Sequence, residues 1–369
     1  MRIGIDAKWY FEGPPSGKMV IRNIVDELLK RDNHHKIYII LDKKIVSQKN
    51  IFLGKNIYPV FVWGGNNLLS NIFWIPFLAK KYELDIIVYQ NFSSFWGGHK
   101  KIAYIHDILF KLYPQFYTTK EKIYFLPLKI LSNISDAVIT VSESEKKHLL
   151  ANGYNKPIDV IYHGVNEIFK PKNFFSLTLL EEVRKKFNLP EKYILFVGRL
   201  NVRKNIYNLL KAISILKSDL KLIIVGEKDW KMFDIQKLID ELNIRNKIVF
   251  TGRVNDEELL AIYAMSNVFV FPSFAEGFGL PPLEAMASGI PIIVSNNTSI
   301  PEICGEAGHY INPNDPYDIA SKLKYVLSNE EIIKQKIEIG LNRSKKFQWS
   351  KSVDQIINLC ENIIYNNAN

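Results

Sequence analysis

Short apolar runs alternate with amphipathic segments along most of the chain. In the first half, "RIGID" (2–6) predicts a buried strand, and apolar residues spaced three and four apart over 17–32 predict a helix. Further buried strands are predicted over 36–41, 85–89, 101–105, 136–141 and 158–162. Strand–helix alternation of this kind predicts a parallel sheet that is covered by helices on both faces.

The second half repeats this alternation after a segment rich in Gly, Pro and Asn, 163–178, which is typical of a linker. It predicts strands over 193–198, 220–226, 247–252, 267–272 and 291–295, and helices near 205–217, 230–243, 256–265, 282–288 and 316–328. We therefore expect two doubly wound α/β domains, over 1–172 and 173–349. Ligands of such folds bind at the carboxyl ends of the strands, so we expect a ligand cleft between the domains.

Composition and charge narrow the class of protein. The 369 residues suit two domains, and 47% apolar with 23% charged residues is typical of a soluble protein. Two cysteines fit no disulfide framework, no leader-like segment opens the chain, and no run of 18 apolar residues occurs, so we expect a cytoplasmic protein. Residues 1–170 hold 23 Lys+Arg against 15 Asp+Glu, which is +8 of the net +10. This excess fits nucleic acid, an anionic membrane or a phosphorylated substrate, and equally an ordinary solvated surface.

The segment "FPSFAEGFGLPPLEAMASGIPIIVS" (271–295) places two carboxylates around a glycine-rich helix start. Gly277 and Gly279 let backbone amides approach a ligand, and a helix start attracts phosphate groups. A phosphate would repel Glu276 and Glu284 unless they bind something else, and sugar hydroxyls are suitable donors to carboxylates. The alternative is an ordinary strand–turn–helix whose glutamates stabilise the helix dipole.

Three other segments hold candidate site residues. In "FVGRLNVRKN" (196–205), Arg199 and Lys204 could neutralise a diphosphate, since cations at a helix start are unfavourable unless an anion binds. His106 and Asp107 follow a predicted strand and could contact the reacting group or its acceptor, although a structural His is the more common case. "GPPSGKM" (13–19) predicts a flexible glycine loop near phosphates. The absence of Asp-x-Asp, Cys-x-x-Cys, His-Glu-x-x-His and Gly-x-Ser-x-Gly leaves metal, redox and hydrolytic chemistry without a signature.

Together, "EGFGLPPLE" (276–284), "VGRLNVRKN" (197–205) and "IHD" (105–107) resemble the retaining GT-B glycosyltransferases of family four, the group 1 glycosyltransferases. The resemblance extends over nearly the whole chain and is weakest at 45–80 and 170–190. It implies two Rossmann-like domains, with a terminal helix near 350–369 that packs back onto the first. The first domain would be the acceptor side and the second would bind the donor.

The resemblance also implies roles for single residues. Glu276 would hold hydroxyls of the donor sugar, and Glu284 would hold the ribose. Arg199 and Lys204 would stabilise the departing nucleoside diphosphate, and His106 would contact the donor sugar near the reacting carbon. Asp107 would lie on the acceptor side. The remaining donor-binding positions would be Gly277, Phe278, Gly279, Leu280, Arg253, Val254 and Gly17.

The expected function is therefore retaining transfer of a sugar from a nucleoside-diphosphate sugar to a lipid-linked or polysaccharide acceptor in surface-glycan biosynthesis, without metal or other cofactor. The pattern looks most like mannosyltransferases, which favours GDP-mannose. The same fold with a UDP- or dTDP-sugar, a nucleotide-sugar epimerase and a nucleic-acid-binding protein are alternatives, and the last gives Glu276 and Glu284 no role. The stretch 108–130 interleaves Lys with Tyr, Phe and Leu, so the first domain could rest on the cytoplasmic face of an anionic inner membrane, or equally form an amphipathic core helix with its loop.

Overall fold

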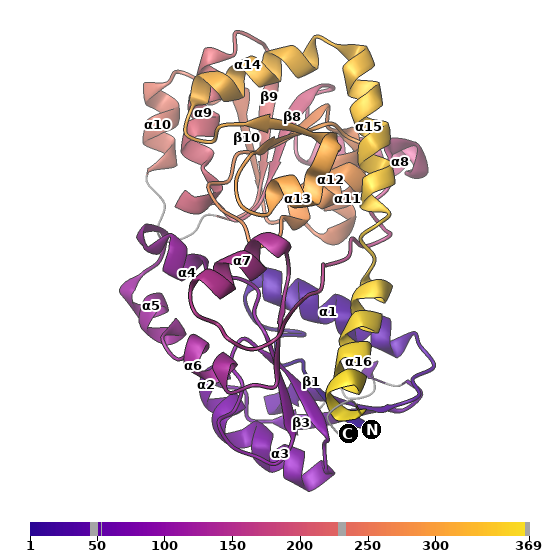
Figure 1. Cartoon of the computed structure of the whole chain (residues 1–369). Coiled ribbons are helices and arrows are strands. Elements are labelled where there is room, and N and C mark those ends of the chain that lie inside the picture. The colour runs from indigo at the N-terminus through magenta and orange to yellow at the C-terminus, as the bar shows by residue number, and fades with distance from the viewer. Residues whose placement is uncertain (45–50, 53, 228–233, 366–369) are drawn as a thin grey trace. The chain divides into compact units, whose positions relative to one another are not determined.

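The computed structural model describes residues 1–44, 51–52, 54–227 and 234–365 (Figure 1). By the contacts between its residues the chain divides into two compact units, one of Met1–Gly164 with Gln348–Asn369, the other of Val165–Phe347. The domain ranges predicted above, 1–172 and 173–349, stay a prediction.

Unit 1 is built on a seven-stranded sheet whose pairings are all parallel, in the order β3-β2-β1-β4-β5-β6-β7. The prediction missed the edge strand β3, because this strand exposes Tyr58 and contains Pro59 and so lacks a continuous apolar run. The other six strands fall where apolar runs predicted them. The strands are β1 Arg2–Asp6, β2 Lys36–Asp42, β3 Ile57–Val62, β4 Ile86–Gln90, β5 Lys100–Tyr104, β6 Ala137–Thr140 and β7 Ile158–Val160.

The helices of unit 1 follow its strands, and the terminal helix joins them. They are α1 Pro15–Leu29, α2 Asn67–Leu69, the π-helix Ser70–Trp74, α3 Ile75–Tyr82, α4 Leu109–Leu112, α5 Thr119–Phe125, α6 Leu128–Asn133, α7 Glu143–Ala151 and α16 Trp349–Tyr365. Figure 1 shows α16, in yellow, beside α1. Polar contacts fix this packing: Arg31 Nη1 lies 2.6 Å from Asp354 Oδ1, and Ser352 Oγ donates to the Tyr162 carbonyl at 2.6 Å.

Unit 2 has a six-stranded parallel sheet in the order β10-β9-β8-β11-β12-β13. In both units the strand order runs 3-2-1-4-5-6 from the first strand of that unit, which is the doubly wound order. The strands are β8 Tyr193–Val197, β9 Lys221–Val225, β10 Ile248–Gly252, β11 Val268–Phe271, β12 Ile292–Ser295 and β13 Gly308–Ile311. The short edge strand β13, "GHYI", was not predicted because a glycine and a histidine interrupt its apolar pattern.

The helices of unit 2 include five that the periodicity predicted, although residues 230–233 of the predicted helix 230–243 lie outside the described part. The prediction missed α8, whose start lies in the expected linker, and α15, whose apolar residues are only half-buried. The helices are α8 Leu177–Lys186, α9 Ile206–Ile215, α10 Ile235–Glu241, α11 Asp256–Met265, α12 Leu280–Ala287, α13 Ile300–Cys304, α14 Pro316–Leu327 and α15 Glu330–Ser344.

Candidate functional site

The loop between β11 and α12 is held in one conformation by its own side chains. Gly279 caps α12 with φ of +110°, a conformation that favours glycine, and a Cβ at this position would lie 2.7 Å from Ile300 Cδ1 and displace the end of that side chain. Ser299 Oγ lies 2.8 Å from the carbonyl oxygens of both Glu276 and Phe278. The backbone N–H of Glu276 donates to Thr298 Oγ1 at 3.0 Å. The loop is therefore fixed without any ligand.

The start of α12 has an unusual set of backbone donors. Pro281 and Pro282 fill the second and third positions of the helix and have no N–H. The amides at this helix start therefore come from Gly277, Phe278, Gly279 and Leu280, all of them in buried residues. The resemblance implied that all four positions bind the donor.

Glu276 is buried and paired with two cations. Its Oε1 accepts from Lys204 Nζ and its Oε2 from Arg203 Nη1, each at 2.7 Å. Burial alone would raise the pKa of this carboxyl, but the charges of Arg203 and Lys204 outweigh it and lower the pKa to about 2. The side chain is therefore an anion at physiological pH, and the three residues together have a charge of +1.

The two cations come from the loop after β8, which is tied to the loop before α12. Lys204 ends a 3₁₀ turn over Val202–Lys204, and its ammonium lies 4.5 Å from the ring centroid of Phe271 at the end of β11. Asn205, with φ of +57°, donates from Nδ2 to the carbonyl of Pro272 at 2.9 Å. Arg199 lies earlier in this loop, and its side chain is exposed.

Glu284 is buried in α12, and its pKa is shifted in the opposite direction to that of Glu276. Tyr263 Oη, from α11, donates to Glu284 Oε2 at 2.9 Å. Burial raises the pKa of Glu284 to about 7, against smaller lowering effects of the Tyr263 hydrogen bond and the Lys204 charge. This carboxyl therefore titrates near neutral pH.

Arg253 and Val254 form the turn between β10 and α11. Gly252 ends β10 with φ of +68°, and Asn255 caps α11 by accepting the backbone N–H of Glu258 at 2.8 Å. The Arg253 side chain is exposed and Val254 is half-buried. Their predicted role in donor binding stays a prediction.

His106 and Asp107 follow β5 of unit 1. His106 Nε2 lies 2.9 Å from Gln90 Oε1, and the ring stacks on Tyr104 with centroids 4.9 Å apart. Burial lowers the pKa of His106 to about 4, so the ring is neutral at physiological pH. Asp107 Oδ1 accepts a hydrogen bond from the backbone N–H of Leu109 at 3.2 Å. This local turn interaction gives Asp107 a structural role in addition to the predicted one.

The expected glycine loop after β1 is shorter than predicted. Gly17 lies in the first turn of α1, which begins at Pro15, so the idea that Gly17 itself lies in a flexible loop is wrong. A Cβ on Gly17 would lie 2.7 Å from the Trp9 ring, so the glycine lets the helix start pack against this indole. Its predicted approach to phosphates stays a prediction.

The structure thus brings some of the candidate residues together in each unit. In unit 2, Glu276, Lys204 and the α12 start lie together, and Arg203 rather than Arg199 completes the ion cluster. The sequence reasoning also missed supporting residues that show no motif of their own: Tyr263, Thr298 and Ser299 in unit 2, and Trp9, Gln90 and Tyr104 in unit 1. Arg203 could have been found, because it precedes Lys204 in the same basic loop.

Comparison with known proteins decides the family. Residues 18–168 match the model "Glycosyltransferase Family 4", and residues 180–343 match "Glycosyl transferases group 1". The O-antigen chain mannosyltransferase B of Escherichia coli is 30% identical over 268 residues, which cover 70% of this chain and 69% of that protein. The chain belongs to glycosyltransferase family 4. It is an enzyme that transfers a sugar, and the resemblance seen in its sequence is confirmed.

Other relatives of this glycosyltransferase match over different lengths. The O-antigen chain mannosyltransferase RfbU of Salmonella typhimurium is 34% identical over 226 residues, which cover 60% of this chain and 59% of that protein. The chain covers only 28% of the serotype-specific mannosyltransferase WbdA of Escherichia coli, at 30% identity.

Solved structures confirm the GT-B fold. Sucrose-phosphate synthase from Thermosynechococcus elongatus superposes with a TM-score of 0.79 at 21% identity and covers 98% of this chain and 99% of its own. Anabaena Alr3699/HepE in complex with UDP-glucose gives 0.74 at 16% identity, with coverage of 98% and 99%. At these identities the likeness concerns the fold alone.

Proposed function

We propose that this glycosyltransferase transfers mannose from GDP-mannose to a lipid-linked or polysaccharide acceptor in surface-glycan biosynthesis, with retention at the anomeric carbon and without a metal. The observation that supports it most is the buried cluster of Glu276, Lys204 and Arg203 beside the glycine-rich start of α12. It combines held cations, backbone amides and an ionised carboxylate in one place. These are the groups that a nucleoside-diphosphate sugar requires.

The proposed reaction stabilises a departing diphosphate. When the bond from the anomeric carbon to the diphosphate oxygen breaks, the electron pair leaves with the diphosphate. Lys204 and the helix-start amides then face more negative charge than in the ground state, and because they are already in position they need little reorganisation. The acceptor hydroxyl bonds to the anomeric carbon on the face that the diphosphate leaves, and its proton passes to a diphosphate oxygen.

The two glutamates would bind hydroxyls in this proposal. Glu276 is ionised, so its oxygens can accept hydrogen bonds from hydroxyls of the donor sugar in addition to those from the cations. Glu284 would accept from the ribose. The neutral His106 ring would contact the reacting group without placing a second positive charge near an oxocarbenium-like carbon.

The choice of mannose rests on the names of relatives, and GDP is the nucleotide that the resemblance to mannosyltransferases favours. Proteins named O-antigen chain mannosyltransferases match this chain at 30% and 34% identity. The HepE structure contains UDP-glucose, so a UDP-sugar is the second candidate donor. A lipid-linked acceptor would lie at the surface of a membrane.

A surface of unit 1 supports the membrane part of the proposal. Ile123 on α5, Leu126 just after it and Ile130 on α6 have exposed fractions of 60%, 70% and 68%. The exposed Lys120 and Lys129 lie in the same helices. Exposed apolar residues flanked by lysines favour contact with an anionic bilayer surface. Across the described part of the chain, no helix combines the length and apolar character needed to cross a bilayer.

The test is a thermal-shift panel of GDP, UDP, dTDP, CDP and ADP, each with and without EDTA. A ligand at about a hundred times its dissociation constant stabilises the protein by roughly 2.7 kcal/mol. We expect GDP to give the largest shift and EDTA to have no effect. Transfer from GDP-mannose, followed by NMR of the product anomer, then tests retention. A shift with UDP alone would move the donor to the UDP-sugars, and no shift with any nucleotide would refute the proposal.

A further inference from the structure

The candidate reaction residue of unit 1, His106, belongs to a row of aromatic rings that reaches the terminal helix. Its ring stacks on Tyr104, and the ring centroid of His163 lies 6.0 Å away. The His163 centroid lies in turn 5.5 Å from the ring of Trp349, the first residue of α16. Both distances are in the range over which aromatic rings interact. Tyr104, His163 and Trp349 are buried, whereas His106 is half-buried, so His106 is the end of the row that a ligand can reach.

The backbone on each side of His163 is fixed to the start of α16. The carbonyl of Tyr162 accepts a hydrogen bond from Ser352 Oγ at 2.6 Å. A Cβ on Gly164 would lie 2.2 Å from the backbone nitrogen of Trp349, so glycine allows the two backbones to meet here. His163 lies between these two contacts. Its ring therefore follows any movement of the first turn of α16.

This contact joins the two places where the chain leaves unit 1 and returns to it. The first stretch of unit 1 ends at Gly164, and the second begins at Gln348. His163 immediately precedes the first place, and Trp349 immediately follows the second. His163 is thus the ring that connects both places with His106.

Packing alone does not require histidines in this row. A buried imidazole has polar atoms whose removal from water costs free energy, whereas an apolar ring has none. Each imidazole here has a polar contact that orients its ring: His163 Nδ1 lies 3.4 Å from Tyr104 Oη, and His106 Nε2 lies 2.9 Å from Gln90 Oε1. Burial lowers the pKa of His106 to about 4 and the pKa of His163 well below its usual range, so both rings are neutral at physiological pH.

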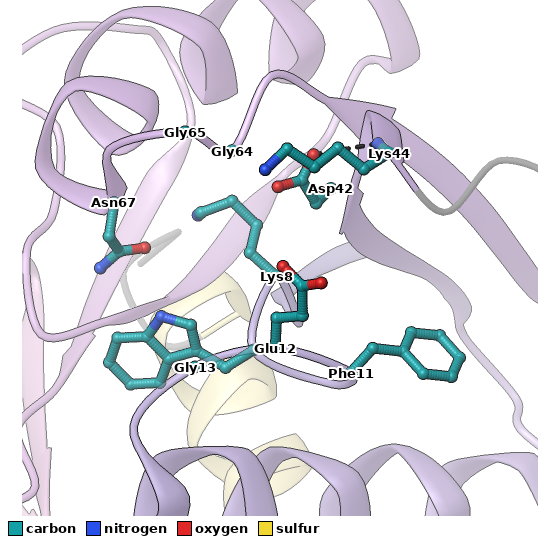
Figure 2. Close-up of a pocket in the computed structure, with 10 residues that line it drawn as sticks. Lys8, Phe11, Glu12, Gly13, Asp42, Lys44, Gly64, Gly65 and Asn67 are labelled. Carbon is teal, nitrogen blue, oxygen red and sulfur yellow. Dashed lines mark hydrogen bonds between the residues drawn. The ribbon is translucent and has the colours of Figure 1, made fainter.

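The row is open beside His106. The ring centroids of Trp9 and His106 lie 6.1 Å apart, and Trp9 is half-buried. Trp9 lines a pocket of unit 1 together with Lys8 and Gly13 (Figure 2). His106 therefore has buried rings on one side and an accessible ring on another. This arrangement suits a side chain that is held in place while part of it stays available to a ligand.

We propose that His163 is a positioning residue which, supported by Trp349, keeps the His106 ring in the orientation that sugar transfer requires. The proposal rests on the proposed function, because it takes His106 to contact the donor sugar. It adds that α16 acts on the reaction through His163.

The kinetic test compares His163→Ala and Trp349→Ala with His99→Ala in the full chain. His99 is the matched control, because it is also a buried histidine of unit 1 in contact with a tyrosine, but it precedes β5 whereas His106 follows it. GDP release from GDP-mannose, to water or to methyl α-mannoside, gives kcat and the donor KM. We expect the first two variants to lower kcat roughly tenfold to a hundredfold with an unchanged donor KM, since a displacement of about 1 Å has an effect of this size. His99→Ala should leave kcat unchanged.

A double-mutant cycle separates positioning from loss of structure. In a His106→Ala background, His163→Ala and Trp349→Ala should lower kcat no further, because the side chain that they position is gone. Trp349→Phe keeps a ring against His163 and should retain most of the wild-type kcat. Equal losses of kcat with and without His106 would overturn the proposal, and so would a wild-type kcat in both alanine variants.

A measurement without substrate keeps this inference separate from the proposed function. In protein whose seven histidines are labelled with ¹⁵N, the His106 ring signal is the one that disappears in His106→Ala. Trp349→Ala should shift this signal and His99→Ala should not; an unchanged signal in Trp349→Ala would refute the connection from α16 to His106. If GDP-mannose releases no GDP and no nucleotide binds, the proposed function fails, and the NMR signal still decides whether the connection exists. Should Trp349→Ala fail to fold, Trp349→Leu, which keeps an apolar side chain without a ring, takes its place.

Discussion

Replacing Glu276 by Gln removes the anion that compensates two buried cations. The folded state holds the pKa of this carboxyl at about 2, against an ordinary value of 4.5. At about 1.36 kcal/mol per pKa unit, the ionised form contributes about 3 kcal/mol to the free energy of unfolding at neutral pH. Loss of one partner from a buried ion pair typically costs about 3–5 kcal/mol, which agrees. Glu276→Gln should therefore abolish transfer and also destabilise unit 2, although the residue lies in a loop.

The pH dependence distinguishes this charge effect from a packing effect. Because the folded pKa is lowered, the stabilisation is complete well above pH 4.5 and is lost as pH falls from about 4.5 through 2. For these two pKa values the difference in the free energy of unfolding between wild type and Glu276→Gln should shrink from about 3 kcal/mol at pH 7 to about 1 kcal/mol at pH 3. Urea titrations followed by circular dichroism at both pH values measure it.

The same variant also melts at a lower temperature. For a unit of roughly 180 residues, about 3 kcal/mol corresponds to roughly 6–12 °C. Glu182→Gln, at an exposed position of α8, is the control and should change stability by less than about 0.5 kcal/mol. If Glu276→Gln is as stable as wild type at pH 7, or if its deficit grows toward acid pH, the reasoning about the ion cluster is wrong.

Further predictions concern Glu284 and Gly279. Because the folded pKa of Glu284 is raised from 4.5 to about 7, the folded state keeps a proton that the unfolded state loses, so the free energy of unfolding should fall by about 3 kcal/mol as pH rises across that window. Glu284→Gln should remove this fall, and an unchanged pH profile in urea titrations would contradict it. Gly279→Ala meets both a positive φ and Ile300, so it should cost about 1–3 kcal/mol in the same titrations. Gly98→Ala, with open space around it, is the control; equal losses for both would count against the strain argument.

The parts of the fold that could be predicted are those with one simple signal. Central parallel strands are buried on both faces, so β8 and β11 show continuous apolar runs and were found. Edge strands such as β3 and β13 have an exposed side or a glycine, and their pairing partners rather than their own residues decide that they are strands. Helix α15 was missed for a related reason, since its apolar residues are only half-buried.

Only those residues of the candidate site that belong to a recognisable motif could be predicted from the sequence. The glycine-rich helix start and Lys204 stood out because their residue types and spacing point to an anion. Whether Arg199 or Arg203 would pair with Glu276 depends on the direction in which the 3₁₀ turn Val202–Lys204 points its side chains. The spacing of residues in the sequence does not predict that direction. The different pKa values of the two glutamates could not be predicted either, because burial and charged partners cause the difference, and both depend on the tertiary structure.

These different pKa values explain how two carboxylates can lie beside a helix start that attracts anions. Glu276 is ionised, but Arg203 and Lys204 more than balance its charge, so an approaching diphosphate meets a net positive cluster. Burial raises the pKa of Glu284 to about 7, which weakens its negative charge at neutral pH. Neither carboxylate therefore presents a full uncompensated negative charge to the phosphates, and both retain oxygens that can accept hydrogen bonds from hydroxyls. A site that bound phosphate alone would gain nothing from these acceptors, whereas a site for a phosphorylated sugar needs both kinds of group at once.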